Sequence, residues 1–139
     1  MLEIGQVLWL KIRFNNDGEI AKSKHPYLII SVNDDYIEAV QRDTIKGKER
    51  KAILRSNKVV DIENPQETVF DESGFVQLDN KFTFENYDEL SNYLQTTDKL
   101  SQEKLKDVIS EYIEYQEKYG VEENKIVHMT KDEIEKLNN

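Results

Sequence analysis

The chain of 139 residues contains no cysteine. Disulfide frameworks, zinc–thiolate sites and cysteine nucleophiles are therefore excluded, and the absence fits a reducing compartment. Histidine is also scarce, with only His25 and His128, so a histidine-rich metal site is excluded too. Only carboxylates remain as metal ligands, and they show no EF-hand spacing. We expect no metal and no cofactor.

Long apolar runs are absent as well. No run approaches the ~20 residues that span a bilayer, and residues 1–12 alternate and carry charge, unlike a signal peptide. We therefore expect a cytoplasmic protein without membrane contact. The five glycines never cluster as a phosphate-cradling loop requires, and no Gly-x-Ser-x-Gly elbow occurs.

The length fits a single domain over residues 1–139, with a strand-rich part at 1–84 and a helical part at 85–139. Pro26 to Val32 is the most apolar run and predicts a buried strand, which Tyr36 to Gln41 extends into a hairpin. Many short strands with close turns indicate a small barrel. The expected strands are residues 5–14, 26–32, 36–41, 52–54, 58–62, 68–70 and 75–78.

The helical part begins with a short helix expected within residues 87–94. Ser101 is a good N-cap for a longer helix, whose apolar stripe is either its packing face or an interface with a partner or a second copy. Gly120 ends this helix, residues 126–129 follow as a strand, and Thr130 with Glu133 predicts a capping box. The expected class is α+β, mainly β, with five to seven short strands, a long C-terminal helix and a short terminal helix.

Charge is distributed unevenly along the chain, whose net charge is -9. Residues 1–60 carry eleven Lys and Arg against eight Asp and Glu, whereas residues 61–139 carry eight against twenty. The densest cationic segment runs from Arg42 to Lys58, where seven cations face only Asp43 and Glu49. Such a segment either binds phosphate locally or is a solvated loop and strand edge.

His25 is the main candidate for chemistry. A histidine titrates near neutrality and can transfer protons, and nearby lysines can stabilise a phosphate; packing locally in a loop is the alternative. A hairpin brings its two outer ends to one edge, so we expect His25 to lie near Arg42 and Thr44. The expected phosphate contacts are Lys22, Lys24, Lys46, Lys48 and Arg50.

Four segments of the chain follow one another in an order found in a known family. The segment from Gly5 to Leu10 (GQVLWL) is similar to a Gly-Asp-Val opening strand, and His25 to Asp34 (HPYLIISVND) is similar to an Arg-Pro step that leads into an apolar strand and Asn-Asp. Ser73 to Asp79 (SGFVQLD) resembles a later strand, and Leu100 to Val108 resembles the start of the C-terminal helix. In these features the chain resembles the MazF/PemK-like toxin family. The resemblance covers roughly residues 3–118.

The resemblance implies an SH3-like barrel, a homodimer, and a metal-independent endoribonuclease that an antitoxin protein neutralises. It further implies that single-stranded RNA, usually messenger RNA, is cut by attack of its 2′-hydroxyl on the adjacent phosphorus. The family arginine of the Arg-Pro step maps onto His25, and its threonine or serine maps onto Thr44. His25 is therefore expected as the acid/base, with Thr44 and Arg42 assisting.

The chain departs from the family at these positions. Histidine titrates where arginine does not, so the change to His25 fits either altered or lost activity. Two other functions stay open. One is a non-catalytic binding module that holds RNA or a protein; the other is an acidic regulator whose helical part mimics nucleic-acid charge. Residues 120–139 have no recognised counterpart and are either a cover or part of a partner interface.

Overall fold

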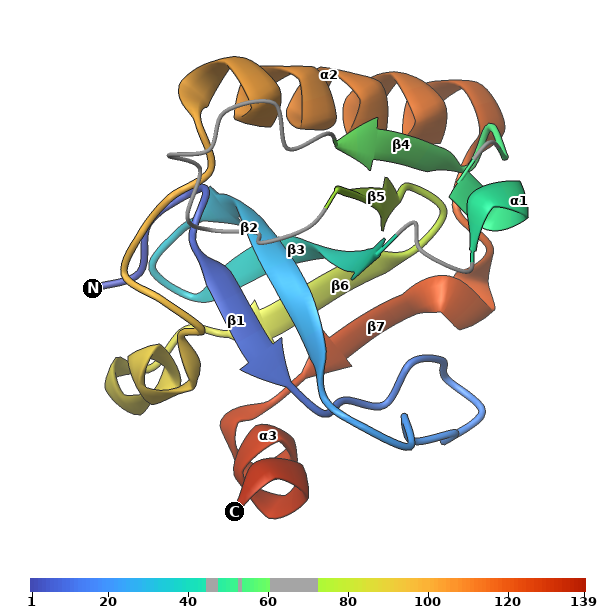
Figure 1. Cartoon of the computed structure of the whole chain (residues 1–139). Helices are drawn as coiled ribbons and strands as arrows, with labels where there is room; N and C mark the ends of the chain where they lie inside the picture. The colour runs from blue at the N-terminus through green and yellow to red at the C-terminus, as the bar shows by residue number, and fades with distance from the viewer. Residues whose placement is uncertain (45–47, 53, 61–72) are drawn as a thin grey trace.

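A computed structural model describes residues 1–44, 48–52, 54–60 and 73–139 (Figure 1). Seven strands join into one sheet within these ranges. The strands are β1 (Val7–Leu10), β2 (His25–Val32), β3 (Tyr36–Thr44), β4 (Asn57–Val60), β5 (Gly74–Gln77), β6 (Lys81–Glu85) and β7 (Ile126–Met129). The helices are α1 (Glu49–Ala52), the 3-10 helix η1 (Asp88–Tyr93), α2 (Gln102–Tyr119), the 3-10 turn η2 (Glu123–Lys125) and α3 (Lys131–Asn138).

β3 is the central strand. One of its edges pairs with β2 and the other pairs first with β6 and then with β5, so the sheet divides along its length. All pairs are antiparallel except β6 with β7, which is parallel. Backbone hydrogen bonds between the described strands do not close the sheet into a barrel. The α+β, mainly β class is confirmed, and so is the first hairpin.

The two faces of the sheet bury separate cores. The first core lies among β1, β2, β3, β6 and β7 and is covered by η1 and α3. Its fully buried aromatic rings, Tyr27, Phe82 and Phe84, meet edge to face at centroid distances of 5.7 and 5.8 Å. Such rings contribute packing energy beyond their buried area. This core makes the first face of the sheet almost inaccessible to ligands except at its rims.

The second core lies beneath α2, which runs across β4 and β5 (Figure 1). Val108 and Tyr112 project from α2 into this core, where they meet Leu28, Val40 and Val76. The Ser101 hydroxyl accepts from the Lys104 amide, as expected of an N-cap, and the helix ends before Gly120, whose φ is 72°. The apolar stripe of α2 is therefore a packing face, which is one of the two possibilities that the sequence left open.

Residues 126–139 belong to the main fold. β7 adds a parallel strand to β6, and α3 covers the first core with Ile134, which is fully buried. The Thr130–Glu133 capping box is present. Asn138 exchanges two hydrogen bonds with the Lys11 backbone, of 2.7 and 2.9 Å, and so substitutes for a strand partner at the end of β1. This segment is a cover, although a partner can still contact its outer surface.

Some expected elements differ from the structure. The strand expected at residues 52–54 is wrong, because Ala52 ends α1 and Leu54 lies in a bend. The helix expected within 87–94 is a 3-10 helix, and β6 was not predicted as a separate strand. The strand expected at 68–70 lies outside the described residues. No described helix is long and apolar enough to cross a membrane.

Candidate functional site at the outer end of the hairpin

His25 opens β2 at the outer end of the hairpin. It pairs with Leu10 of β1, and Pro26 follows it opposite Trp9. The His25 side chain is 31% exposed, and its Nδ1 lies 3.9 Å from the Asp43 Oδ1. This distance is that of an ion pair and is too long for a hydrogen bond. The imidazole therefore has one nitrogen beside a carboxylate and remains reachable from solvent.

Asp43 is a site residue that the sequence did not indicate. Tyr27 of β2 pairs with Gln41 of β3. Two residues further along each strand, the same register sets His25 opposite Asp43. Gln77 donates to the Asp43 Oδ2 at 3.1 Å, whereas the Lys48 ammonium lies 3.5 Å from Oδ1, the oxygen that faces His25. The carboxylate is only 13% exposed, so Gln77 and the strand hold it in a fixed orientation toward the imidazole.

Arg42 lies on the other face of the sheet. Side chains alternate along a strand, and Arg42 pairs with Val76, which belongs to the core under α2. Arg42 is only 4% exposed, and its guanidinium crosses Gly74, where a Cβ atom would come within 2.6 Å of Nε. In this position Arg42 packs and does not present its charge to a ligand at the His25 edge.

Thr44 follows the same alternation. It pairs with Gly74, and by the two-residue period of the strand it shares the face of Arg42. The structure therefore does not bring His25, Arg42 and Thr44 to one surface, which corrects the neighbourhood expected from the hairpin. The physical reason is that adjacent residues on a strand point to opposite faces, so only Asp43 can meet His25.

The expected phosphate contacts are divided among several places. Lys22 and Lys24 are exposed and flank His25 along the chain, Lys48 pairs with Asp43, and Arg50 is exposed on α1. Lys46 lies outside the described residues. The cations near His25 are therefore Lys22 and Lys24 before the strand and Lys48 on the far side of Asp43.

An open pocket of about 430 Å³ lies beside His25. Its walls combine an aromatic ring, a lysine, the histidine and three side-chain amides: Phe14, Ala21, Lys22, His25, Gln41, Gln77 and Asn80. Amides offer both donors and acceptors, and an aromatic ring offers a stacking face. These are the groups that recognise a nucleotide, with the imidazole placed at the same opening.

Tyr27 follows His25 by two residues on β2 and shares its face of the sheet. The ring is fully buried, and within the described part of the chain its hydroxyl has no hydrogen-bond partner. Burial, and to a lesser degree the negative charge of Asp43, raises the pKa of Tyr27 well above its ordinary value. The phenol therefore stays neutral, and next to Asp43 it is a potential proton donor in a hydrogen bond, not a base.

Comparisons of this chain with protein-family models, with curated proteins and with solved structures find no match.

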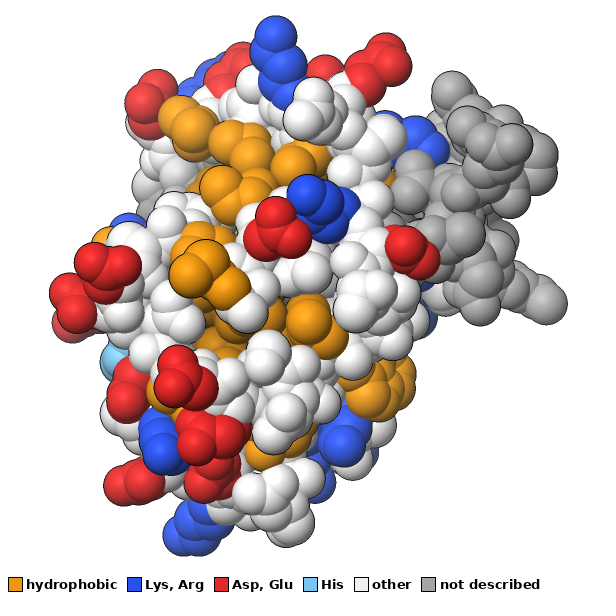
Figure 2. Space-filling view, turned by 90° about the vertical axis from the view of Figure 1, so that its left-hand side faces the viewer, with side chains coloured by type: hydrophobic (Ala, Val, Ile, Leu, Met, Phe, Trp, Pro, Cys, Tyr) orange, Lys and Arg blue, Asp and Glu red, His pale blue; other side chains and the backbone are white. Residues whose placement is uncertain are grey.

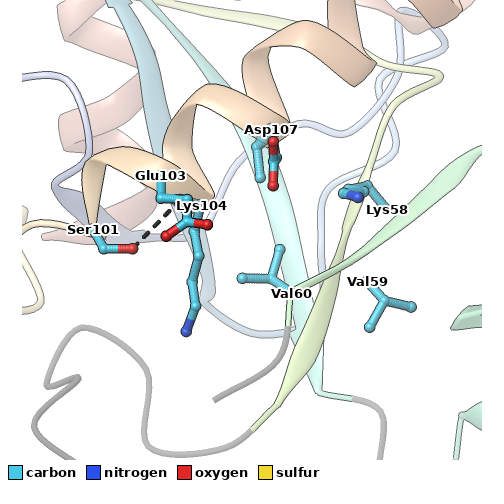
Figure 3. A pocket seen from close by; sticks show the side chains of 8 residues that line it. Lys58, Val59, Val60, Ser101, Glu103, Lys104 and Asp107 are labelled. Atoms are coloured by element: carbon cyan, nitrogen blue, oxygen red, sulfur yellow. Dashed lines mark hydrogen bonds between the residues drawn. The ribbon is translucent and has the colours of Figure 1, made fainter. Parts of the chain in front are cut away.

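A second pocket, of about 230 Å³, lies between β4 and the start of α2 (Figure 3). Its acidic side chains, Glu103 and Asp107, stand near two lysines, Lys58 and Lys104. The charges balance, so the pocket has no surplus cation for a phosphate. The Ser101 hydroxyl at its rim already caps α2.

The second histidine is placed differently from the first. His128 is exposed on β7, and its Nδ1 lies 2.8 Å from the Thr83 hydroxyl. Among the described residues, a carboxylate forms an ion pair with His25 but none does so with His128. His25 is therefore the better candidate for proton transfer, and His128 is its natural control.

Proposed function

We propose that this chain is a metal-independent endoribonuclease of the MazF/PemK type, which acts in the cytoplasm on single-stranded RNA, chiefly messenger RNA. One observation carries the proposal: His25 opens into a pocket with Lys22 and three amides while a held carboxylate, Asp43, lies behind its Nδ1. A base whose second nitrogen faces a carboxylate is the usual arrangement for a histidine that accepts protons.

The proposed reaction needs one proton acceptor and one cation. The His25 Nε2 takes the proton of the ribose 2′-hydroxyl, the 2′ oxygen bonds to the adjacent phosphorus, and the bond from phosphorus to the 5′ oxygen breaks. The departing oxygen takes its proton from water. Lys22 stabilises the charge that grows on the phosphate oxygens, and Asp43 orients the imidazole and stabilises it once protonated.

The proposal extends to fold and partners. We propose that the divided sheet is an opened form of the SH3-like barrel, because one long strand, β3, serves two neighbouring strands on the same edge. We also propose a homodimer and an antitoxin protein that neutralises the enzyme. Both rest on the ordered resemblance of segments from Gly5 to Val108.

The test is cleavage of a long single-stranded RNA in the presence of EDTA. We expect cleavage by the unaltered protein, a loss of about 10²-fold to 10⁴-fold in His25→Ala, and a smaller loss in Asp43→Asn. His128→Ala is the matched control and should cleave normally. Urea unfolding curves establish that each variant is folded. Undiminished cleavage by folded His25→Ala would falsify the catalytic role.

A non-catalytic RNA-binding module is the second candidate. The burial of Arg42 favours it, because a family member without an exposed arginine at this site lacks one source of transition-state stabilisation. This candidate predicts that the protein retards RNA in a gel while leaving every tested RNA intact, with His25→Ala behaving like the unaltered protein.

A further inference from the structure

A second aromatic site lies on the face of β1 that points away from His25. Leu8 and Leu10 are fully buried in the first core, so Trp9 between them points the other way and is 43% exposed. Trp9 is the chain's one tryptophan. Its side of β1 also carries Val7, which lies beneath α2, whereas Trp9 lies beyond that cover.

The hollow around Trp9 has a volume of about 330 Å³. Its walls are an indole, a phenol, an aliphatic side chain, two amides and a single cation: Trp9, Lys24, Asn92, Tyr93, Leu94 and Gln95. The Tyr93 hydroxyl is held by Asn139 at 2.9 Å. One wall is thus fixed before any ligand arrives.

The chemistry of these walls selects among ligands. A site that binds another protein would require a larger exposed apolar area. A single exposed apolar residue is not evidence of such a site, because these are common on any protein surface. The combination of a flat aromatic face, two amides and one lysine without a carboxylate in the lining is different. It offers stacking for a base, hydrogen bonds for the base edge and a charge for one phosphate.

The hollow and the His25 pocket lie on opposite faces of the β1–β2 pair, one residue apart in register. Trp9 pairs with Pro26, and its neighbour Leu10 pairs with His25. Lys22 and His25 line the first pocket, whereas Lys24, between them in sequence, lines the hollow. A single strand of RNA therefore has to cross the segment of residues 22–25 to reach both openings. On the face shown in Figure 2, apolar side chains reach the surface in separate patches among charged and polar ones.

We propose that the Trp9 hollow is a nucleotide subsite, in which a base of single-stranded RNA stacks on the Trp9 indole and its phosphate contacts Lys24. The ligand class rests on the proposed function, because that function makes RNA the substrate. The subsite holds the strand on the face of β1 opposite His25 and does not touch the reacting phosphate. It therefore governs affinity and register, whereas His25 governs the chemical step.

The test uses the tryptophan as its own reporter. In His25→Ala, which leaves the RNA intact, a single-stranded RNA of about ten nucleotides should quench the fluorescence of Trp9 saturably. With a fluorescein label on the same RNA, anisotropy should show that Trp9→Ala binds about 5-fold to 150-fold more weakly. Trp9→Phe keeps an aromatic face and should lie between the two.

Two further variants complete the design. Lys24→Gln should bind more weakly and show a smaller dependence of affinity on salt. Tyr36→Ala removes an aromatic side chain that is 40% exposed at the turn end of the hairpin, away from His25, and should bind normally. Urea unfolding curves are the check that the Trp9 variants are folded.

The outcomes separate the subsite from the catalytic proposal. If RNA quenches Trp9 and Trp9→Ala binds more weakly, but the unaltered protein cleaves no RNA, the subsite is supported and the nuclease is refuted. If the unaltered protein cleaves RNA, but RNA does not quench Trp9 and Trp9→Ala binds RNA as tightly as before, the subsite is overturned and the nuclease proposal stands. Quenching by double-stranded RNA as strong as by the single strand also overturns it, because a paired base does not expose its face.

Discussion

Arg42 is the one charged side chain that is buried among the described residues. Its guanidinium can cross β5 only because residue 74 is a glycine, since an added Cβ would come within 2.6 Å of the Arg42 Nε and would also meet the Asp43 carbonyl oxygen. This glycine therefore serves close packing and not a special backbone conformation. It also sets the position of Asp43, the next residue along β3.

Gly74→Ala should destabilise the fold by about 1–3 kcal/mol, because the methyl group forces Arg42 and the β3 backbone to move. The free energy of unfolding in urea measures this. Ser23→Ala is the control, because this side chain is exposed in the loop before β2. A Gly74→Ala protein as stable as the parent would contradict the packing of Arg42 over β5.

The partner of His25 could not be predicted, because it depends on a β-bulge. Near the turn, Val32 pairs with Ile37, and an unbroken register from there would set His25 opposite Thr44. The register shifts by one residue between Ile29 and Ser31, which places Asp43 there instead. A one-residue shift exchanges the two faces of a strand. The hairpin was thus predictable from the sequence, but the residue facing His25 was not.

At the scale of elements, local signals predicted well where the chain supplies its own boundaries. Ser101 and Gly120 bound α2, and Thr130 with Glu133 begins α3, because caps satisfy backbone groups locally. The prediction failed for short segments, because pairing with distant strands decides whether such a segment becomes a strand. Residues 52–54 have strand-like composition but no described partner strand, and β6 becomes a strand through its contacts with β3 and β7.

Polar contacts help to fix α2 to the sheet: the Gln116 amide donates to the Leu78 and Asn80 carbonyl oxygens, and Tyr112 contacts Glu38 inside an apolar interface. The Tyr112 hydroxyl donates to the Glu38 Oε2 at 2.5 Å, and Tyr112 is only 4% exposed. Burial first, and then the Glu38 carboxylate, raises the pKa of Tyr112 above its ordinary value of 10.0. The folded chain therefore retains this proton at a pH where the unfolded chain releases it.

Tyr112→Phe should lower the free energy of unfolding near neutral pH by about 1–3 kcal/mol, because Glu38 loses its partner. Stability of the parent should fall as the pH rises above about 10, since the unfolded state then binds fewer protons. In Tyr112→Phe this alkaline fall should be smaller. Urea midpoints between about pH 8 and pH 11 measure both effects, with the exposed Tyr36→Phe as control; equal slopes would refute the linkage.

At the scale of the whole molecule, the acidic half of the chain completes the fold that the first half begins. α2 covers one face of the sheet, and β7 with α3 covers the other. The cations that lie near His25 stay at the opposite end of the hairpin from its turn. Under the proposed function, RNA should therefore approach the rim of the sheet where Lys22 and Lys24 lie, and not the acidic outer surface of α2.

A chain that ends at Gly120 should not fold cooperatively. Val127, Met129 and Ile134 are fully buried, and each such loss costs about 2–5 kcal/mol against a total stability of about 5–15 kcal/mol. Removal also uncovers the edge of β6, because β7 is its parallel partner. Near-ultraviolet circular dichroism and a urea titration should show no fixed tertiary structure and no sharp transition.

Thr130→Ala in the full chain is the control for the shortened chain, because it removes the helix cap of α3 and leaves the buried side chains in place. It removes only the hydroxyl that accepts from the Glu133 amide and should cost about 1 kcal/mol with an intact transition. If the shortened chain unfolds as sharply as Thr130→Ala does, the first core does not depend on the terminal segment. Residues 121–139 would then be free to serve as an interface for a partner, which the buried position of Ile134 argues against.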